Sequence, residues 1–171
     1  MTESTHPHVA YPPIAVPSAI GQMMEEDIAR LHRAIRATFS PPAAARTLAE
    51  AGRRAAEELL RPFSPEERRR RLSLPRDEAV AGLFDLLHAW APFFVAERRL
   101  VAVAGARPAL IIAGNPLCDG APRGMRVCAW HTALFETLFQ ALVAPEALVR
   151  ETACLAQGDP ECRFEVDFGM G

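Results

Sequence analysis

The chain has 171 residues and a formal net charge of −2, so it carries no overall positive field that would draw it to nucleic acid. All 19 residues in the combined lysine and arginine count are arginine, because the sequence contains no lysine. Lysine-dependent phosphate loops, pyridoxal-phosphate enzymes and Schiff-base catalysts are therefore excluded. Half of the residues (50%) are hydrophobic, which fits a single domain with a real core.

The N-terminal region, residues 1–21, is predicted to be an extended proline-rich arm, and residues 22–171 are predicted to form one domain. The sequence contains no run of about 18 apolar residues and no basic-then-apolar signal pattern. We therefore expect a cytoplasmic protein without a transmembrane segment. In a reducing cytoplasm, cysteines are thiols or metal ligands before they are disulfides.

Four helices are predicted in the first half of the domain. Apolar residues at four-three-four spacing predict a helix over residues 22–39. Ser40-Pro41 is typical of an N-cap followed by the first helical position of a second helix. Ser64 and Glu67 stand at capping-box spacing and predict the start of a short third helix. The fourth helix is expected over residues 77–90.

The pattern then becomes strand-like. Residues 100–103 and 109–112 flank a Gly-Ala-Arg-Pro turn and predict a hairpin, and residues 128–143 return to helical spacing. Two further strands are predicted over residues 148–156 and 161–168, the second with a clean alternation of apolar and polar residues. The predicted fold class is α+β: N-terminal helices packed with a four-stranded antiparallel sheet, with one helix inserted and a C-terminal β-hairpin.

The candidate site of the chain is a metal site in its last third. Three thiols and a carboxylate suit a four-coordinate zinc ion, and the predicted ligands are Cys128, Glu151, Cys154 and Cys162. Cys154 and Cys162 flank the turn Gly158-Asp159-Pro160-Glu161, so a hairpin would bring their sulfurs together. A zinc ion here would be structural and would fasten a helix to the sheet.

A regular strand does not allow this site. Glu151 and Cys154 are three residues apart, so on an ideal strand they would project to opposite faces about 10 Å apart. A shared zinc ion therefore requires a break in the pleat. We predict a β-bulge at Thr152-Ala153, or a strand that ends there.

Other interpretations of these residues remain open. Cys154 and Cys162 are also consistent with cross-strand core thiols or a hairpin disulfide, with Glu151 paired to Arg163. His131 lies one turn after Cys128 and is expected beside the site, hydrogen-bonded at its edge, or as a ligand in place of Glu151. Cys118 falls outside the motif and is predicted to be a free thiol, while Asn115-Pro116 is turn chemistry first.

The C-terminal motif resembles that of the vinyl-4-reductase domain family. The residues that carry the resemblance are Cys128-Ala129-Trp130-His131, then Glu151 through Cys154, and Gly158-Asp159 through Cys162-Arg163-Phe164. Asn115-Pro116-Leu117-Cys118 and the helix that follows resemble one branch of the family, the J-type proteins of bacteriochlorophyll synthesis, long called 4-vinyl or 8-vinyl reductases. The motif-bearing part of the chain spans residues 115–168.

The resemblance implies a metal-braced α+β scaffold that binds a small molecule. The family shares its fold with vesicle-tethering subunits that enclose an apolar cavity, and in phenol-sensing regulators the same domain binds an aromatic effector beside a zinc ion. It also suggests a homodimer. Candidate residues for a flat aromatic pocket are Phe84, His88, Trp90 and Phe135.

Three functions are compatible with this resemblance. The first is a tetrapyrrole-binding or carrier protein of bacteriochlorophyll synthesis, working with a pigment-synthesis enzyme. The second is the 8-vinyl reductase that the historical name describes. The third is a ligand-sensing or scaffold module. Vinyl reduction normally takes its two electrons from a nicotinamide, flavin or iron–sulfur cofactor, and the sequence has neither Gly-x-Gly-x-x-Gly nor Cys-x-x-Cys. We therefore favour binding over catalysis.

Overall fold

The structure is a computed structural model, and it describes residues 25–90, 100–105 and 107–169. The proline-rich arm predicted over residues 1–21 lies outside these ranges. Within the described part of the chain, none of the helices has the length and apolar character needed to cross a membrane.

Five α-helices form among the described residues as the sequence pattern predicts, with ends that differ by a few residues at most. They are α1 (Glu25–Thr38), α2 (Pro41–Leu60), α3 (Pro65–Leu72), α4 (Arg76–Trp90) and α5 (Ala129–Leu142). The capping box at the start of α3 is confirmed: the Ser64 hydroxyl accepts a hydrogen bond from the Glu67 amide (3.2 Å), and the Glu67 carboxylate accepts one from the Ser64 amide (2.7 Å). Ser40 occupies the N-cap position of α2, although its side chain makes no capping bond.

The strands make one antiparallel sheet in the order β1-β2-β4-β3. Their bounds are β1 (Leu100–Val103), β2 (Ala109–Ile112), β3 (Leu148–Ala153) and β4 (Cys162–Asp167), and two short 3-10 helices, η3 (Pro116–Cys118) and η4 (Leu155–Gln157), lie in the connections. The predicted α+β class and the hairpin at 100–112 are confirmed. Strand β3 ends earlier than the predicted residue 156, because η4 and the left-handed Gly158 (φ 98°) begin the return to β4.

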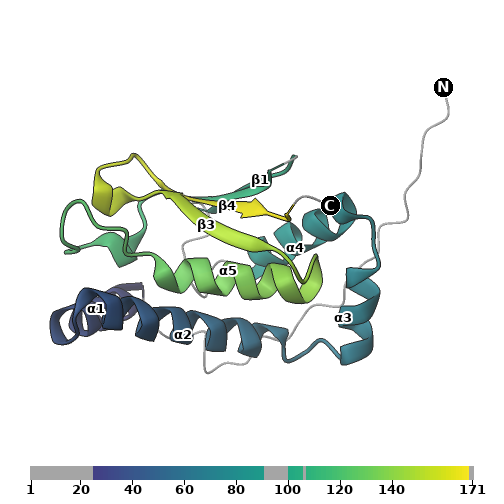
Figure 1. Ribbon diagram of the computed structural model, residues 1–171, viewed down its shortest axis with the longest axis horizontal. Helices are drawn as coiled ribbons and strands as arrows, with labels where there is room; N and C mark the ends of the chain where they lie inside the picture. Colours follow the sequence, from purple (N-terminus) through teal and green to yellow (C-terminus); the bar gives the residue numbers. More distant parts are fainter. Residues whose placement is uncertain (1–24, 91–99, 106, 170–171) are drawn as a thin grey trace.

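Helix α5 is the central layer of the molecule. Figure 1 shows it between the sheet on one side and α2 on the other, with α1 continuing the α2 layer. The approach of α2 to α5 is very close at Gly52, where an added Cβ would lie 2.2 Å from the Trp130 carbonyl oxygen. The core between α5 and the sheet is aromatic: Phe135 and Phe164 meet edge to face at 5.3 Å and are fully buried.

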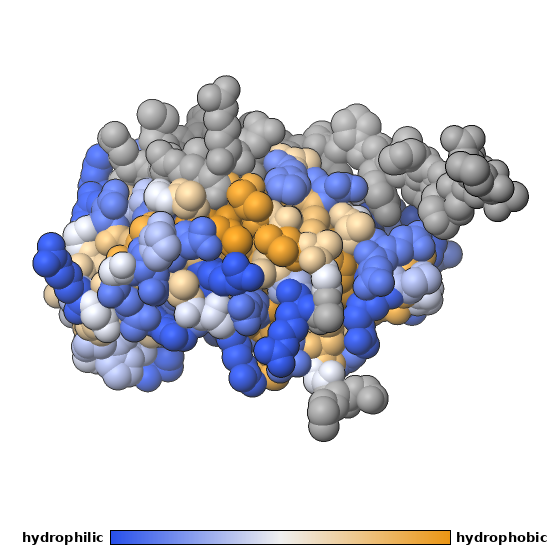
Figure 2. All heavy atoms as spheres, turned by 90° about the horizontal axis from the view of Figure 1, so that it is seen from above, coloured by the Kyte–Doolittle hydropathy of each residue, from blue (hydrophilic) through white to orange (hydrophobic). Residues whose placement is uncertain are grey.

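The outer face of the sheet is partly apolar. Figure 2, which views the molecule from the sheet side, shows hydrophobic side chains in the middle of this face and hydrophilic ones around them. Among the strand residues, Val101 (50% exposed) and Leu148 (45% exposed) are large apolar side chains that remain in contact with solvent. The opposite face of β4 buries Cys162, Phe164 and Val166, which confirms the alternation predicted for this strand.

Candidate metal centre

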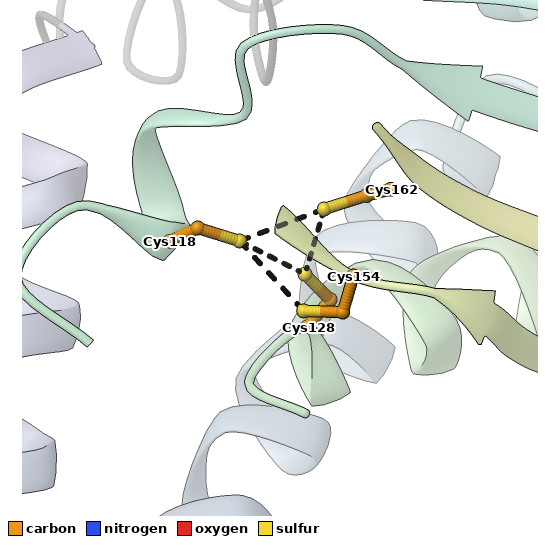
Figure 3. Close-up of side chains that lie close together, drawn as sticks. All are labelled: Cys118, Cys128, Cys154 and Cys162. Atoms are coloured by element: carbon orange, nitrogen blue, oxygen red, sulfur yellow. Dashed lines mark hydrogen bonds between the residues drawn. The ribbon is translucent and has the colours of Figure 1, made fainter. Parts of the chain in front are cut away.

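Four cysteine sulfurs meet at the end of the sheet next to the start of α5. Cys118 closes η3, Cys128 is the N-cap of α5, Cys154 precedes η4, and Cys162 begins β4. Figure 3 shows the four side chains pointing toward one another. Their Sγ atoms all lie within 4.8 Å of one another. All four cysteines are free, so the disulfide interpretation of Cys154 and Cys162 is wrong.

The spacing of the sulfurs fits one tetrahedral ion. Two thiolates that each lie about 2.3 Å from a zinc ion, at the tetrahedral angle, are about 3.8 Å apart. The Sγ of Cys118 lies 3.7 Å from Cys128, 4.0 Å from Cys154 and 3.5 Å from Cys162, and Cys128 lies 3.6 Å from Cys162. Iron–sulfur clusters spread their thiolates around several iron atoms and need a wider spacing. The donor set therefore fits a single thiophilic ion such as zinc.

The predicted bulge in β3 is confirmed. Glu151 pairs with Phe164 and Ala153 pairs with Arg163, so Thr152 is an extra residue in β3. The inward face of the strand changes at this point: Val149 and Glu151 are buried before the bulge, and Cys154 is buried after it. The bulge thus allows two residues three positions apart to reach the same side of the sheet.

The structure corrects the prediction for Cys118. The spacing argument left it outside the motif as a separate thiol, but its sulfur belongs to the cluster. Glu151, which the same argument placed in the ligand set, is 8% exposed, and its Oε1 has no hydrogen-bond partner among the described residues. Burial is the main reason that its pKa is raised to about 8, and the Cys154 thiol adds to the shift. Cys128, Cys154 and Cys162 lie together as predicted.

Asn115 holds the cluster from the side, a role that the sequence pattern did not reveal. Its amide nitrogen donates to the sulfurs of Cys128 (3.3 Å) and Cys162 (3.5 Å). Its side-chain oxygen accepts a hydrogen bond from the Leu117 amide (3.1 Å), which is the turn chemistry that was predicted. The same side chain therefore starts η3 and donates to two of the four sulfurs, as the groups around metal-bound thiolates typically do.

Arg126 supports the bulge. Its guanidinium donates to the backbone oxygen of Glu151 and to the side chain of Gln157 (3.2 Å). Arg163 forms its ion pair with Glu165 (3.1 Å), so the alternative pairing of Glu151 with Arg163 is wrong.

His131 is fully buried on α5, but its ring nitrogens are not among the donor atoms that meet at the four sulfurs. Its ring stacks on Phe135 (5.8 Å) and lies against Trp130 (5.0 Å). The place of His131 at the edge of the site remains a prediction.

Hydrogen bonds among the sulfurs separate their pKa values. Those with Cys118, Cys154 and Cys162, together with burial, raise the pKa of Cys128. Hydrogen bonds from Cys118 and Cys128 lower the pKa of Cys162, and one from Cys128 is the main reason that the pKa of Cys154 falls to about 5. Four thiolates this close together repel one another, so without a cation some sulfurs keep their protons. A divalent ion at the centre would let all four ionise.

A buried positive charge lies on α1 near the cluster. All three guanidinium nitrogens of Arg36 are buried and have no hydrogen-bond partner among the described residues. Burial lowers its pKa, while electrostatic attraction to Cys118 and Cys128 works in the opposite direction. Because arginine remains protonated even when buried, this charge would be stabilised by a negatively charged cluster.

The four predicted pocket residues are not brought together in one hollow by the described part of the structure. Phe84, Trp90 and Phe135 are buried in the core, where Phe84 contacts Phe139 (6.2 Å) and Trp90 contacts Phe63 (6.3 Å). His88 is exposed on α4. Their role in ligand binding remains a prediction.

A small hollow of about 70 Å³ lies elsewhere, between α1, α2 and the segment before α5. Its walls include Leu48, Val127, Arg36 and Arg126. Typical ligand pockets measure about 300 to 1,000 Å³, so this hollow suits one short arm of a larger molecule.

Solved structures with this fold bind different ligands. The chain is similar to the phenol-responsive sensory domain of the transcription activator PoxR, in complex with phenol (TM-score 0.52, 13% identity, 84% of this chain and 74% of that one). It is also similar to a trafficking protein particle complex subunit 3 from Naegleria fowleri covalently bound to palmitic acid (TM-score 0.54, 13% identity, 85% and 95%). A vinyl-4-reductase family protein from Methanocaldococcus jannaschii matches with a TM-score of 0.42 and 14% identity over 88% of this chain and 86% of that one. At these identities the first two likenesses show the fold alone.

Sequence comparison identifies the family. Residues 108–168 match the vinyl-4-reductase domain. The chain is 36% identical over 149 residues to the bacteriochlorophyll synthase 23 kDa chain of Cereibacter sphaeroides, covering 85% of this chain and 71% of that one. It is 42% identical over 79 residues to the protein of the same name from Rhodobacter capsulatus, covering 45% of this chain and 35% of that one. The chain therefore belongs to the family of the bacteriochlorophyll synthase 23 kDa chain and carries a vinyl-4-reductase domain.

Proposed function

We propose that the chain binds a tetrapyrrole intermediate of bacteriochlorophyll synthesis and carries it to a pigment-synthesis enzyme in the cytoplasm, as a homodimer. The observation that supports this most is the 36% identity to a protein named as a chain of bacteriochlorophyll synthase. A chain of a synthase works with other chains, so an enzyme partner is part of the proposal. Four free thiols are consistent with a reducing compartment.

We propose that zinc occupies the four-sulfur cluster and that its role is structural. Zinc bound by four protein ligands has no open position for a substrate, and such sites contribute directly to folding. Cys118, Cys128, Cys154 and Cys162 come from a loop, the start of a helix and both sides of a hairpin. One ion would therefore fasten these segments to one another.

The ligand would contact the protein through its ring and its acidic arms. A tetrapyrrole intermediate carries short carboxylate side chains, and Arg36 and Arg126 line the hollow of about 70 Å³ between α1 and α2. The hollow is large enough for one such arm but not for the ring. The predicted aromatic residues Phe84, His88, Trp90 and Phe135 remain candidates for ring contacts.

Two other functions are kept as alternatives. The historical name of the resembling branch favours an 8-vinyl reductase, which would need an electron donor that the sequence motifs do not provide. The fold likeness to a phenol-responsive sensory domain favours a ligand-sensing module, which would need an output partner.

The test is to quantify zinc in the purified protein and to titrate divinyl protochlorophyllide while recording its absorption spectrum. A saturable spectral shift without turnover under supplied NADPH supports the carrier. Stoichiometric reduction of the 8-vinyl group would replace the carrier with the reductase. The absence of any spectral change would remove both and leave the sensing module.

The structural role of the metal has its own test. Cys154→Ser should lose the metal and raise amide hydrogen exchange in the β3–β4 hairpin, because this thiol stands at the hairpin's inner end. A variant that loses the metal but remains equally protected would show that the four sulfurs are only core thiols.

A further inference from the structure

The cluster offers five donor groups for the four positions of a tetrahedral ion. The four sulfurs are close enough to share one ion. Glu151 is the fifth donor: its side chain is 8% exposed, its Oε1 has no hydrogen-bond partner among the described residues, and it interacts with the side chains of Cys154 and Cys128. A buried carboxylate oxygen without a partner carries a large desolvation cost, so an additional partner is expected for it.

The four sulfurs are not equivalent. Cys128, Cys154 and Cys162 are fully buried (0% exposed) and belong to the ends of α5, η4 and β4. Cys118 is the one partly exposed sulfur ligand, and it stands in the connection between β2 and α5. Its position depends on η3, a single turn of three residues. Of the four sulfurs, Cys118 is therefore the one that can leave with little disturbance of the core.

Glu151 is held in place for the opposite reason. The bulge at Thr152 fixes its direction, and the Arg126 guanidinium binds its backbone oxygen. The carboxylate therefore stays beside the cluster whether or not the loop with Cys118 moves.

We propose that Cys118 and Glu151 are alternative fourth ligands of the metal, so that the ion has three fixed thiolates and one exchangeable position. In one form the ion binds four thiolates. In the other form the sulfur of Cys118 leaves and takes up a proton, and Glu151 gives up its proton and binds through a carboxylate oxygen. One metal–sulfur bond breaks, one metal–oxygen bond forms, no electrons are transferred, and the net charge of the centre with a divalent ion stays at −2.

The exchange gives Cys118 a conditional reactivity. As a ligand it is protected, and after exchange it is a half-buried thiol at the surface, where soft electrophiles and competing metal-binding groups can reach it. Arg36 interacts electrostatically with Cys118, which favours the thiolate during the exchange.

This inference rests on the proposed metal site, and Co²⁺ substitution tests both. In Co²⁺-loaded protein the intensity of the sulfur-to-metal charge-transfer band rises with the number of bound thiolates. Cys118→Ser should keep one Co²⁺ per chain and lose about a quarter of this intensity, while Glu151→Gln should keep the metal and the full band. The double variant should lose at least about 100-fold in affinity beyond either single variant, since even the loss of an outer-shell group costs about 10- to 100-fold.

Thiol alkylation of the zinc-loaded protein provides the second measurement. Iodoacetamide should modify Cys118 first, as shown by peptide mapping, while the zinc remains bound. In Glu151→Gln this modification should slow down or release the zinc, because no replacement ligand is present. Cys154→Ser serves as the control for loss of a fixed ligand, with low metal affinity whether or not Glu151 is present.

The possible outcomes are distinct. A double variant that binds Co²⁺ as tightly as Cys118→Ser would overturn the exchange while leaving the metal site in place. Wild-type protein that binds neither Co²⁺ nor Zn²⁺ would overturn both the metal site and this inference. If Cys118→Ser alone loses the metal, Glu151 is not a ligand, and the exchange is likewise refuted.

Discussion

Replacement of Gly52 by alanine should loosen the packing of α2 on α5. The added Cβ would lie 2.2 Å from the Trp130 oxygen, 3.0 Å from the Trp130 carbonyl carbon and 3.2 Å from the Leu134 nitrogen. These are backbone atoms, so no rotamer change can relieve the overlap, and the two helices must move apart by about 1 Å. Overpacking of this kind costs about 1 to 3 kcal/mol.

Helix propensity acts in the opposite direction, because alanine in the middle of a helix is about 1 kcal/mol better than glycine. The expected net loss is therefore about 1 to 2 kcal/mol in the free energy of unfolding. For a chain of this size, each kcal/mol lowers Tm by about 2 to 4 °C.

Urea unfolding and calorimetry would measure this loss in Gly52→Ala. Ala51→Gly is the matched control, since Ala51 is the exposed neighbour in the same helix and reports the propensity difference alone. Trp130 lies two residues after Cys128, so the Co²⁺ spectrum of the Gly52 variant should also change. A variant as stable as wild type, after the propensity correction, would refute the close contact between α2 and α5.

Three further predictions concern single side chains. Asn115→Ala removes the donor to the sulfurs of Cys128 and Cys162, and should lower metal affinity about 10- to 100-fold in a chelator competition; unchanged affinity would mean that these bonds do not form in the loaded protein. Burial lowers the pKa of His32 from 6.5 to about 4, so the unfolded chain takes up this proton first and the folded protein loses stability as the pH falls from 6.5 toward 4, by about 3 kcal/mol in all. His32→Leu should remove this part of the pH dependence in urea unfolding, and identical slopes would contradict it. Arg36→Met should raise the unfolding free energy of the metal-free protein, by about 1 to 4 kcal/mol, and weaken metal binding, because the buried charge has no partner until the cluster ionises; equal effects in both states would show that Arg36 and the cluster are not coupled.

The elements of the fold could be predicted because their signals are local. The capping box of Ser64 and Glu67 and the alternation of β4 each depend on residues within a few positions of one another. The bulge could also be predicted, since two inward ligands three residues apart cannot share a regular strand. Here a requirement of the site specified a detail of the backbone.

The full membership of the cluster could not be predicted, because it depends on the path of a connection. Cys118 reaches the site only because the chain after β2 folds back over the start of α5, and nothing in its neighbouring residues specifies that path. Asn115 had a visible signal as a turn residue, but its bonds to Cys128 and Cys162 span 13 and 47 residues. Spacing within a motif predicted three of the four sulfurs, and tertiary structure supplied the other.

The extra residue at Thr152 has a consequence for reading other chains. Before it, the inward positions of the strand are odd-numbered, as at Val149 and Glu151; after it, the inward position is even-numbered, as at Cys154. A change of parity among candidate ligands along one strand is therefore a reason to look for an inserted residue rather than to discard the site. Deleting Thr152 should restore a single parity and turn either the carboxylate or the thiol toward water.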